Sequence, residues 1–376
     1  MKKPLPRAII VSVLSIWIFV LCGTLASKQP ITETKLPVIV GPTEPPSLGT
    51  EKTKLLLEKD LTIGSNVVNQ DDYLGLVDAL QVDNDGNIYI LSRQTQVVKI
   101  FNKNGGFLRN IGGKKSSYKG FQNLIGLGVS PEYGILIFAR NNLYSFTVEG
   151  KLVRETEAPQ GINDPCLDSL GNIIAVNNYT RLNKTLSGED APRFVLELKK
   201  YNLDFVPYAI LAKHERVSTS KTINAFPEWL YFTVLKDGGI AWGVNKQYEV
   251  TILDKDAIPI GMIRKDFNPI IIPEIEKQKI AKKVIPESNI KVEFPEYYPP
   301  FSSIHADDEG RIFVETFENS PEGMKYSDVF NLEGQYIAKI AVKGIIMCWK
   351  KSKLYAMESD ESGGISRIIR YKAVWE

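Results

Sequence analysis

The sequence predicts an all-β chain folded as a six-bladed β-propeller whose ring is closed by an N-terminal strand. The first observation is a series of short runs that alternate apolar and polar residues, which is the period of β-strands. The second is a four-strand unit that recurs six times, with turns roughly 40 to 70 residues apart, as is typical of propeller blades. Turn residues mark the same place in each unit: Gly86, Gly134, Gly171, Gly238, Gly310 and Ser352.

The first unit is the clearest copy. Its first hairpin is "VDNDGNIYILS", from Val82 to Ser92. A second turn follows at Asn104-Gly105-Gly106, so the unit is read as two consecutive hairpins. The expected strands are Leu80–Val82, Ile88–Leu91, Val97–Phe101 and Phe107–Ile111.

The acidic turn Asp83–Gly86 could instead begin a calcium-binding loop. An EF-type loop needs a glycine at position 6 and an acid at position 12, and counting from Asp83 these positions hold Ile88 and Gln94. The pattern therefore favours a structural turn, in which Asp83 accepts backbone hydrogen bonds and Gly86 supplies a positive φ.

Two of the spacings are long enough to contain insertions. They are placed at about 177–193 together with 213–227, and at about 263–300. The second insertion predicts a short helix with Ile275, Ile280 and Val284 on one side, followed by the aromatic-proline run "FPEYYPPF".

The last unit ends after its third strand, at about 365–374. The stretch Leu55–Ile63 reads as a strand that has no unit of its own. We expect it to supply the fourth strand of the last blade, because this closes the ring and leaves no open sheet edge.

The N-terminus indicates export. Three basic residues precede the uncharged apolar run Ala8–Ala26, so residues 1–26 are expected to be a signal peptide, cleaved after Ala26, or an uncleaved signal anchor. Lipidation at Cys22 is a weaker alternative, because Leu21 is bulkier than the residue that usually precedes a lipidated cysteine. Residues 27–51 read as a Pro/Thr-rich tether or surface-hugging arm, and 52–376 as the propeller. The expected location is periplasmic or extracellular, with membrane attachment through 8–26 if that segment is retained.

Charge and cysteine content narrow the function classes. The chain has 46 basic and 44 acidic residues, and without Lys2, Lys3 and Arg7 the balance becomes 43 to 44. A near-neutral body offers no positive field for phosphate backbones, so nucleic acid is not expected as a partner. Beyond Cys22 only Cys166 and Cys348 remain, each in an apolar strand context that favours a small buried side chain.

The units resemble NHL-type repeats, in particular those of exported six-bladed β-propeller proteins of bacteria. The resemblance rests on Leu80–Ile90 and Ile100–Gly105, on "FLRNIGGKKSSYKGFQNL" at 107–124, and on "YYPPFSSIHADDEGRIFVE" before the fifth turn. It covers about residues 52–376. Because proteins of this kind include binding modules, lyases and lactonases, the resemblance implies the fold and leaves the function open.

One mouth of the central channel is the expected functional region. The second strand of each blade ends on the face where the innermost strands begin, so polar residues at these ends line that mouth. Arg93 and Arg140 could clamp an anion, and Glu315 and Glu358 could bind a cation or a basic side chain. The candidate ligand-binding residues are Ser92, Arg93, Arg140, Asn177, Asn245, Glu315, Thr316 and Glu358.

The channel itself is expected to be lined by Gln81 and His305, which occupy equivalent places on innermost strands. The other histidine, His214, falls in an insertion, and the positions equivalent to His305 hold no second histidine and no consistent acid. No metal site, no catalytic residue and no cofactor are therefore predicted. Calcium is considered only if the protein is a metal-assisted enzyme.

These observations favour a non-catalytic recognition or scaffold module outside the cytoplasm, which binds a protein or a small ligand on a propeller face. One alternative is a lactonase-like or lyase-like propeller enzyme acting at the mouth near Arg93, Asn177, Asn245 and Glu315. Another is an anchored accessory subunit of a membrane complex. The ligand and the oligomeric state are not predicted.

Overall fold

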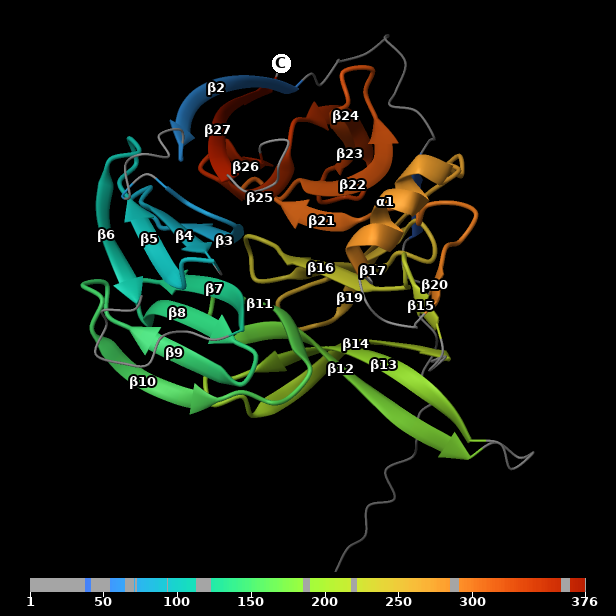
Figure 1. The fold of residues 1–376 in the computed structure, drawn as a ribbon, viewed down its shortest axis with the longest axis horizontal. Helices are drawn as coiled ribbons and strands as arrows, with labels where there is room; N and C mark the ends of the chain where they lie inside the picture. Colours follow the sequence, from blue (N-terminus) through green and yellow to red (C-terminus); the bar gives the residue numbers. More distant parts are fainter. Residues whose placement is uncertain are drawn as a thin grey trace, which may run out of the picture. The chain divides into compact units, whose positions relative to one another are not determined.

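The computed structural model describes residues 38–41, 55–64, 71, 73–92, 94–112, 123–184, 190–217, 222–284, 291–359 and 366–375. Within these residues the chain forms six blades of four antiparallel strands each, arranged as a propeller, and one blade carries an additional parallel strand (Figure 1). This confirms the predicted fold class. The predicted segments 1–26 and most of 27–51 lie outside the described residues.

The first three blades follow one another along the chain. Blade 1 contains β3 (Val77–Val82), β4 (Ile88–Ser92), β5 (Val97–Phe101) and β6 (Phe107–Gly112). Blade 2 contains β7 (Leu124–Ser130), β8 (Gly134–Ala139), β9 (Asn142–Phe146) and β10 (Leu152–Glu157). Blade 3 contains β11 (Ile162–Leu167), β12 (Ile173–Lys184), β13 (Asp190–Tyr201) and β14 (Pro207–Val217).

The last three blades complete the ring. Blade 4 contains β16 (Leu230–Val234), β17 (Ile240–Val244), β18 (Glu249–Leu253) and β19 (Pro259–Lys265). Blade 5 contains β21 (Ser303–Ala306), β22 (Ile312–Asn319), β23 (Lys325–Phe330) and β24 (Tyr336–Val342). Blade 6 contains β25 (Ile345–Lys350), β26 (Lys353–Ser359), β27 (Ser366–Trp375) and β2 (Leu55–Ile63).

The ring closes where β2 pairs with β27. β2 pairs antiparallel with β27 over Leu55↔Trp375 to Ile63↔Ile368, so the strand predicted to complete the last blade does so. Figure 1 shows the blue β2 beside the red β27 at the outer edge of blade 6. Every described blade therefore has four strands, and none of them ends one strand short.

The hydrophobic core lies between the blades. In the described structure there are six clusters of buried apolar residues, and each one is shared by two neighbouring blades. The cluster of blades 5 and 6, for example, packs Phe313 and Val329 against Trp349 and Leu354, with the rings of Phe313 and Trp349 stacked 4.3 Å apart. Because each sheet buries both faces, the blades hold one another in place and leave the loops free to vary.

The turn residues behave as the sequence predicts. Gly86 has a φ of 89°, and the Asp83 carboxylate accepts hydrogen bonds from the backbone N–H groups of Asp85 and Asn87 at 2.9 and 2.8 Å. The same arrangement recurs at Asp168 in blade 3 and at Asp307 in blade 5. In each of these turn aspartates Oδ1 accepts the backbone hydrogen bonds, and Oδ2 accepts from side chains.

The first predicted insertion, at about 177–193, is mainly a hairpin of two long strands. β12 and β13 continue past the end of a normal blade as a long hairpin, which protrudes from the ring in Figure 1. His214, placed by the sequence in this insertion, lies on β14, the outermost strand of blade 3, and its Nε2 is 2.6 Å from Glu228. The extra residues thus lengthen one blade and leave its topology unchanged.

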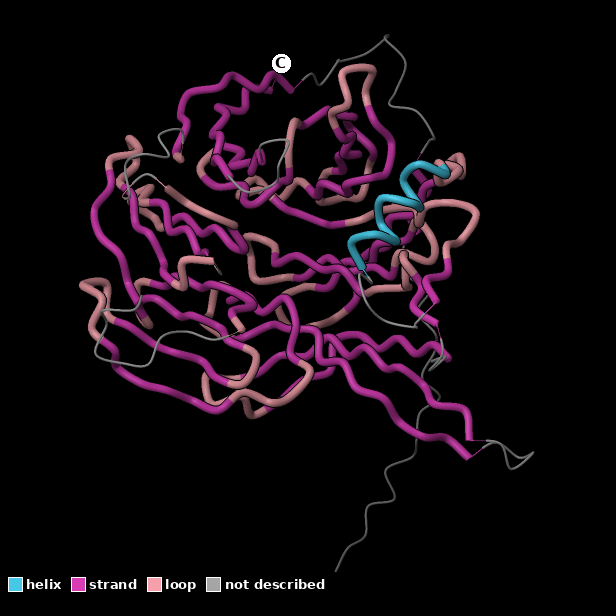
Figure 2. Tube along the Cα trace, in the orientation of Figure 1, coloured by secondary structure: helices cyan, strands magenta, loops and turns pink. Residues whose placement is uncertain are grey.

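Additional elements surround blades 4 and 5. β1 (Val38–Gly41) adds a parallel fifth strand to β19 of blade 4. β15 (Thr222–Asn224) and β20 (Lys291–Glu293) pair with each other, and α1 (Glu274–Val284) precedes β20. Figure 2 shows α1 in cyan as the helix beside these blades. We call the described residues 222–228, 266–284 and 291–302 the cap. No helix in the described part of the chain is long and apolar enough to span a bilayer.

Candidate functional site

The strand pairing shows where the residues predicted to line the mouth lie within the blades. In three blades the first residue of the innermost strand pairs with a predicted mouth residue on the second strand: Val77↔Ser92, Ile162↔Asn177 and Ser303↔Glu315. Ser92 is the last residue of β4, whereas β12 and β22 continue past Asn177 and Glu315. All three predicted residues lie beside the start of an innermost strand. The side chains at these positions differ in what they bind.

Both predicted asparagines hold the protein's own backbone. The Asn245 side-chain oxygen accepts a hydrogen bond from the Trp229 N–H at 2.7 Å, and Asn245 is 5% exposed. The Asn177 side-chain nitrogen donates to the Gln160 carbonyl at 2.8 Å. Each amide binds the segment that leads into an innermost strand, β16 for Asn245 and β11 for Asn177. Both side chains therefore hold that segment in place.

Glu315 and Thr316 are buried on blade 5. The Glu315 carboxylate accepts hydrogen bonds from the Ser302 hydroxyl at 3.0 Å and from Lys325 Nζ at 2.8 Å. Thr316 donates to the Tyr326 carbonyl at 3.2 Å. The negative charge of Glu315 thus reaches the mouth, although one lysine partly balances it.

The remaining predicted residues are spread around the ring. Ser92 is buried, and its hydroxyl accepts a hydrogen bond from the Thr95 N–H at 3.3 Å. Arg140 is exposed, and Glu358 lies 3.5 Å from Lys343. Arg93 lies outside the described residues, so the proposed arginine clamp stays a prediction.

Asp164 is a mouth residue that the sequence analysis missed. It has a φ of 50° at a break in the β11–β12 register, a backbone conformation that non-glycine residues seldom adopt. Its side chain is exposed to solvent and accepts a hydrogen bond from the Trp229 side chain. Surrounding protein nevertheless desolvates the carboxylate and raises the pKa of Asp164, while the Trp229 hydrogen bond acts in the opposite direction.

The signal that could have revealed Asp164 is the "NDP" sequence at 163–165. Asn-Asp-Pro interrupts the apolar alternation of an innermost strand, and an Asx-Pro pair favours a turn or a bulge. In the other blades the equivalent positions carry no Asp-Pro pair. A local irregularity in an otherwise regular repeat was therefore the clue.

The pKa of Tyr231 is affected by acids from two other blades. Burial, the largest cause, and the negative charges of Asp164 on blade 3 and Glu315 on blade 5 together raise the pKa of Tyr231 to about 12. Tyr231 lies on β16 of blade 4, and its ring packs edge-on against Phe301 at 5.8 Å. Two acids, Asp164 and Glu315, thus lie near the aromatic residues Trp229 and Tyr231, and the four residues come from blades 3, 4 and 5. We call Asp164, Trp229, Tyr231 and Glu315 the acidic rim.

The two predicted channel residues lie on innermost strands, Gln81 on β3 and His305 on β21, and both are partly exposed. His305 Nε2 lies 2.9 Å from the Ser303 hydroxyl. Cys166 and Cys348 are also on innermost strands, and burial raises the pKa of each thiol to about 12. Both cysteines are therefore neutral thiols at physiological pH.

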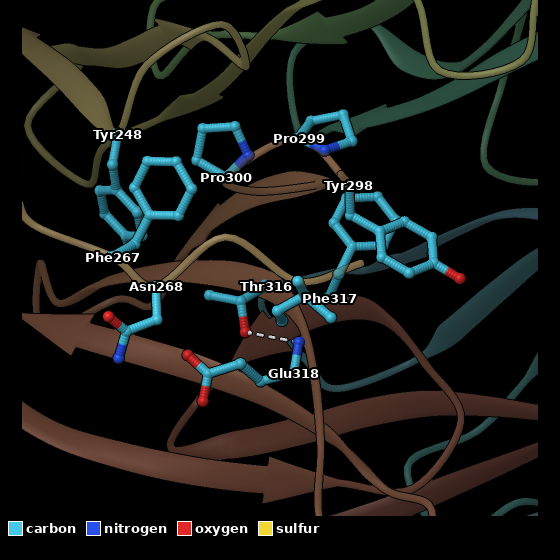
Figure 3. A pocket seen from close by; sticks show the side chains of 10 residues that line it. Tyr248, Phe267, Asn268, Tyr298, Pro299, Pro300, Thr316, Phe317 and Glu318 are labelled. Carbon is cyan, nitrogen blue, oxygen red and sulfur yellow. Dashed lines mark hydrogen bonds between the residues drawn. The ribbon is translucent and has the colours of Figure 1, made fainter. Parts of the chain in front are cut away.

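A small pocket lies between the cap and blade 5 (Figure 3). Its empty volume, including the opening to solvent, is about 280 Å³. Tyr298 and Phe317 stack at 4.6 Å on one side, and Thr316, whose hydroxyl accepts from the Glu318 N–H at 3.3 Å, lies on another. Of the predicted site residues only Thr316 reaches this pocket.

A wider and more polar depression lies between blades 2 and 3, with about 690 Å³ of space open to solvent. Asn142 donates to Glu155 there at 2.8 Å, and the loop that Asn177 fixes contributes Gln160. Its groups bind one another and are well exposed, as is ordinary for a protein surface. Among the described residues, no group of three or more His, Cys, Asp or Glu side chains is arranged to hold a metal ion.

The sequence matches no protein-family model and none of the curated proteins with which it was compared. Solved structures do resemble its fold. A member of the DUF4221 family from Bacteroides vulgatus superposes with a TM-score of 0.51 at 14% identity, covering 86% of this chain and 99% of that one. A candidate exported protein from Bacteroides fragilis gives a TM-score of 0.49 at 13% identity over 90% of this chain and 99% of that one. Virginiamycin B lyase from Staphylococcus aureus gives 0.45 at 11% identity, over 86% and 100%. At these identities the likeness concerns the fold alone.

Proposed function

We propose that this protein is an exported recognition module that binds a cationic group, an ammonium or a guanidinium, at the acidic rim of its propeller. Export is supported by the basic N-terminus and the apolar run Ala8–Ala26. Binding without chemistry is the role that rigid blades with variable loops serve well.

The observation that carries the proposal is the state of Asp164. Asp164 is a surface residue, but surrounding protein desolvates its carboxylate and raises its pKa, and its backbone is held at a φ of 50°. Such a conformation costs on the order of 1–2 kcal/mol and persists where the surrounding structure imposes it, often at a binding site. A cation would relieve the desolvated carboxylate and would therefore bind here more strongly than at an ordinary surface acid.

The aromatic side chains of the rim support the same ligand class. Trp229 and Tyr231 flank the two acids, and aromatic faces attract ammonium and guanidinium groups. Glu315 on blade 5 adds a second negative charge that acts on Tyr231. The rim thus combines charge and ring faces in the way that recognition of organic cations requires.

The hydrogen bonds of three predicted mouth residues support a binding role for the rim. Asn177 and Asn245 are each engaged with backbone groups, and Thr316 with the Tyr326 carbonyl. We therefore assign a positioning role to each of these three residues. What faces solvent at the rim is a carboxylate beside aromatic rings.

A calorimetric titration tests the proposal with a matched pair of probes, arginine amide and citrulline amide, each acetylated on its α-amino group so that neither carries an ammonium. The two molecules have nearly the same shape, and only the first carries a guanidinium charge. We expect the protein to bind arginine amide and to bind citrulline amide at least tenfold more weakly. Equal affinity for both, or no heat with either, would rule out a cation site. An arginine-containing peptide that binds much more tightly than arginine amide would identify the ligand as a protein.

The same preparation tests the enzyme alternative. Bound calcium or zinc in stoichiometric amount, lost together with hydrolytic activity in Glu315→Gln, would support a metal-assisted propeller enzyme instead. N-terminal sequencing of the protein recovered from membranes distinguishes a cleaved signal from a retained anchor, and a retained anchor would support the accessory-subunit alternative.

A further inference from the structure

Ser303 and His305 form a hydrogen-bonded pair on the channel wall. The two residues are two positions apart on β21, so their side chains point to the same side of the strand. Ile304 between them is 4% exposed and packs in the core shared by blades 4 and 5, whereas Ser303 and His305 are partly exposed. The pair therefore faces away from that core and can be reached by solvent.

The geometry of the pair is that of a nucleophile and its base. The distance from the Ser303 hydroxyl oxygen to His305 Nε2 is 2.9 Å, within the 2.6–3.2 Å range expected for such a contact. With the ring proton on Nδ1, Nε2 accepts the serine proton. The neighbouring Ser302 is bound differently, because its hydroxyl donates to the Glu315 carboxylate.

The surroundings keep the imidazole ready to accept a proton. Desolvation by the channel wall lowers the pKa of His305 below its ordinary value of 6.5, with the Glu315 charge acting in the opposite direction. The ring is therefore neutral at pH 7. The negative charge of Glu315 favours the imidazolium that forms when the ring takes up a proton.

The backbone of β21 offers donors for a developing negative charge. β21 is the innermost strand of its sheet, which runs β21-β22-β23-β24, so it pairs with a neighbouring strand on one side only. In an antiparallel pair every second N–H points away from the partner strand. Along β21 these N–H groups point toward the channel, where they can donate to an oxyanion.

From this arrangement we propose that Ser303 is an activated nucleophile that accepts acyl groups from small carboxylic esters entering the channel. The Ser303 oxygen bonds to the acyl carbon while its proton passes to His305 Nε2. The ester C–O bond then breaks, and the alcohol leaves with the proton from His305. Water repeats the sequence: its oxygen bonds to the acyl carbon, its proton passes through His305, and the Ser303–acyl bond breaks. The net change is hydrolysis of the ester, with no oxidant or cofactor needed.

This inference goes beyond ligand recognition at the rim and does not depend on it. Arginine amide binding reports on Asp164, whereas covalent capture reports on Ser303. Each of the two proposals can therefore fail while the other stands.

Reaction of the full chain with a fluorophosphonate, followed by peptide mapping, tests the proposal. We expect a single adduct on Ser303, which is absent in Ser303→Ala. In His305→Gln the labelling rate should fall by about 10²- to 10⁴-fold, the usual contribution of a general base. Ser145→Ala, on the third strand of blade 2, should label like the wild type.

Peptide mapping of the unaltered protein makes the test independent of how well the variants fold. No adduct, or an adduct on a serine other than Ser303, would overturn the proposal. So would an adduct on Ser303 that forms at the wild-type rate in His305→Gln, because the histidine would then contribute nothing to activation.

Discussion

The carboxylate of Asp60 on β2 accepts a hydrogen bond from Arg370 Nε on β27 at 2.7 Å, which ties the closing strand to the last blade. Its second oxygen accepts from Lys353 Nζ on β26 at 2.8 Å. Arg370 also donates to the Lys103 carbonyl of blade 1 at 2.6 Å. One acid–base cluster thus joins three strands of blade 6 and the neighbouring blade where the ring closes.

Replacing Asp60 by Asn should weaken this closure. We expect Asp60→Asn to lower the free energy of unfolding by about 2 kcal/mol, the scale of a hydrogen bond to a charged group. Denaturation in urea measures the change, and Glu322→Gln, an acid on a blade 5 turn far from the closure, serves as the control. If Asp60→Asn matches the wild type, the cluster does not contribute to closing the ring.

The contribution of Asp60 should also depend on pH. Burial disfavours its charge, but hydrogen bonds from Arg370 and Lys353 outweigh this and hold the pKa of Asp60 below its ordinary value of 3.8. Because the folded-state pKa is lowered, the stabilisation is fully present above pH 3.8 and is lost as pH falls through the folded-state value. The stability gap between wild type and Asp60→Asn should therefore stay constant from pH 7 to pH 5 and shrink below pH 3.8. A gap that shrinks between pH 7 and pH 5 would contradict this assignment.

Substitution of Asp328, which belongs to a buried ion pair, should lower the free energy of unfolding more than substitution of Asp60. Lys265 Nζ on blade 4 lies 2.8 Å from the Asp328 carboxylate on blade 5, and the hydroxyls of Tyr248 and Tyr336 donate to the same carboxylate at 2.7 and 2.8 Å. Removing one partner leaves a buried charge without compensation, so Asp328→Ala should cost about 3–5 kcal/mol.

The double variant Lys265→Met with Asp328→Leu is the informative comparison for this pair. It removes both charges and should recover most of the lost stability, since apolar replacements of buried ion pairs are often neutral. Thermal and urea denaturation of the three proteins decide the point. A double variant no more stable than Asp328→Ala would mean that the hydrogen bonds of the tyrosines, and not the uncompensated lysine, set the cost.

Alanine substitutions at two glycines distinguish the cost of backbone strain from the cost of steric overlap. Gly134 has a φ of 71°, and an added Cβ would lie 2.2 Å from the Phe146 carbonyl oxygen, whereas Gly323 has a φ of 77° with no atom within 4 Å of such a Cβ. Gly323→Ala should cost about 1–2 kcal/mol, the price of the left-handed conformation alone. Gly134→Ala should cost clearly more, because its sheet must also shift. Equal costs, measured by urea denaturation, would show that the β8–β9 hairpin relaxes freely.

The parts of this structure that repeat could be predicted from the sequence. The turn glycines, the four-strand units and the closing role of Leu55–Ile63 each depend on local patterns of polarity and on a simple need to pair a sheet edge. Asp83 was correctly assigned to a turn because its calcium-ligand spacing fails and its relatives keep only the glycine.

The parts that depend on one blade's neighbours could not be predicted. Asp164 reaches the mouth through a break in strand register, and its pKa depends on protein that surrounds it in space but not in sequence. The partners of Asn177 and Asn245 are backbone groups that only the folded ring brings together. The insertion predicted at 177–193 is a hairpin extension, because periodicity alone does not tell a long strand from a strand followed by a loop.

The most direct test of the proposed function compares the affinity of arginine amide for wild type, Asp164→Asn and Asp256→Asn by calorimetry. Asp256 is an exposed acid in the β18–β19 turn, on the face opposite the mouth, and it is already paired with Lys255. We predict that Asp164→Asn weakens binding at least tenfold, which corresponds to about 1.4 kcal/mol, and that Asp256→Asn leaves it unchanged. Equal affinities in all three proteins would contradict the assignment of the acidic rim as the binding site.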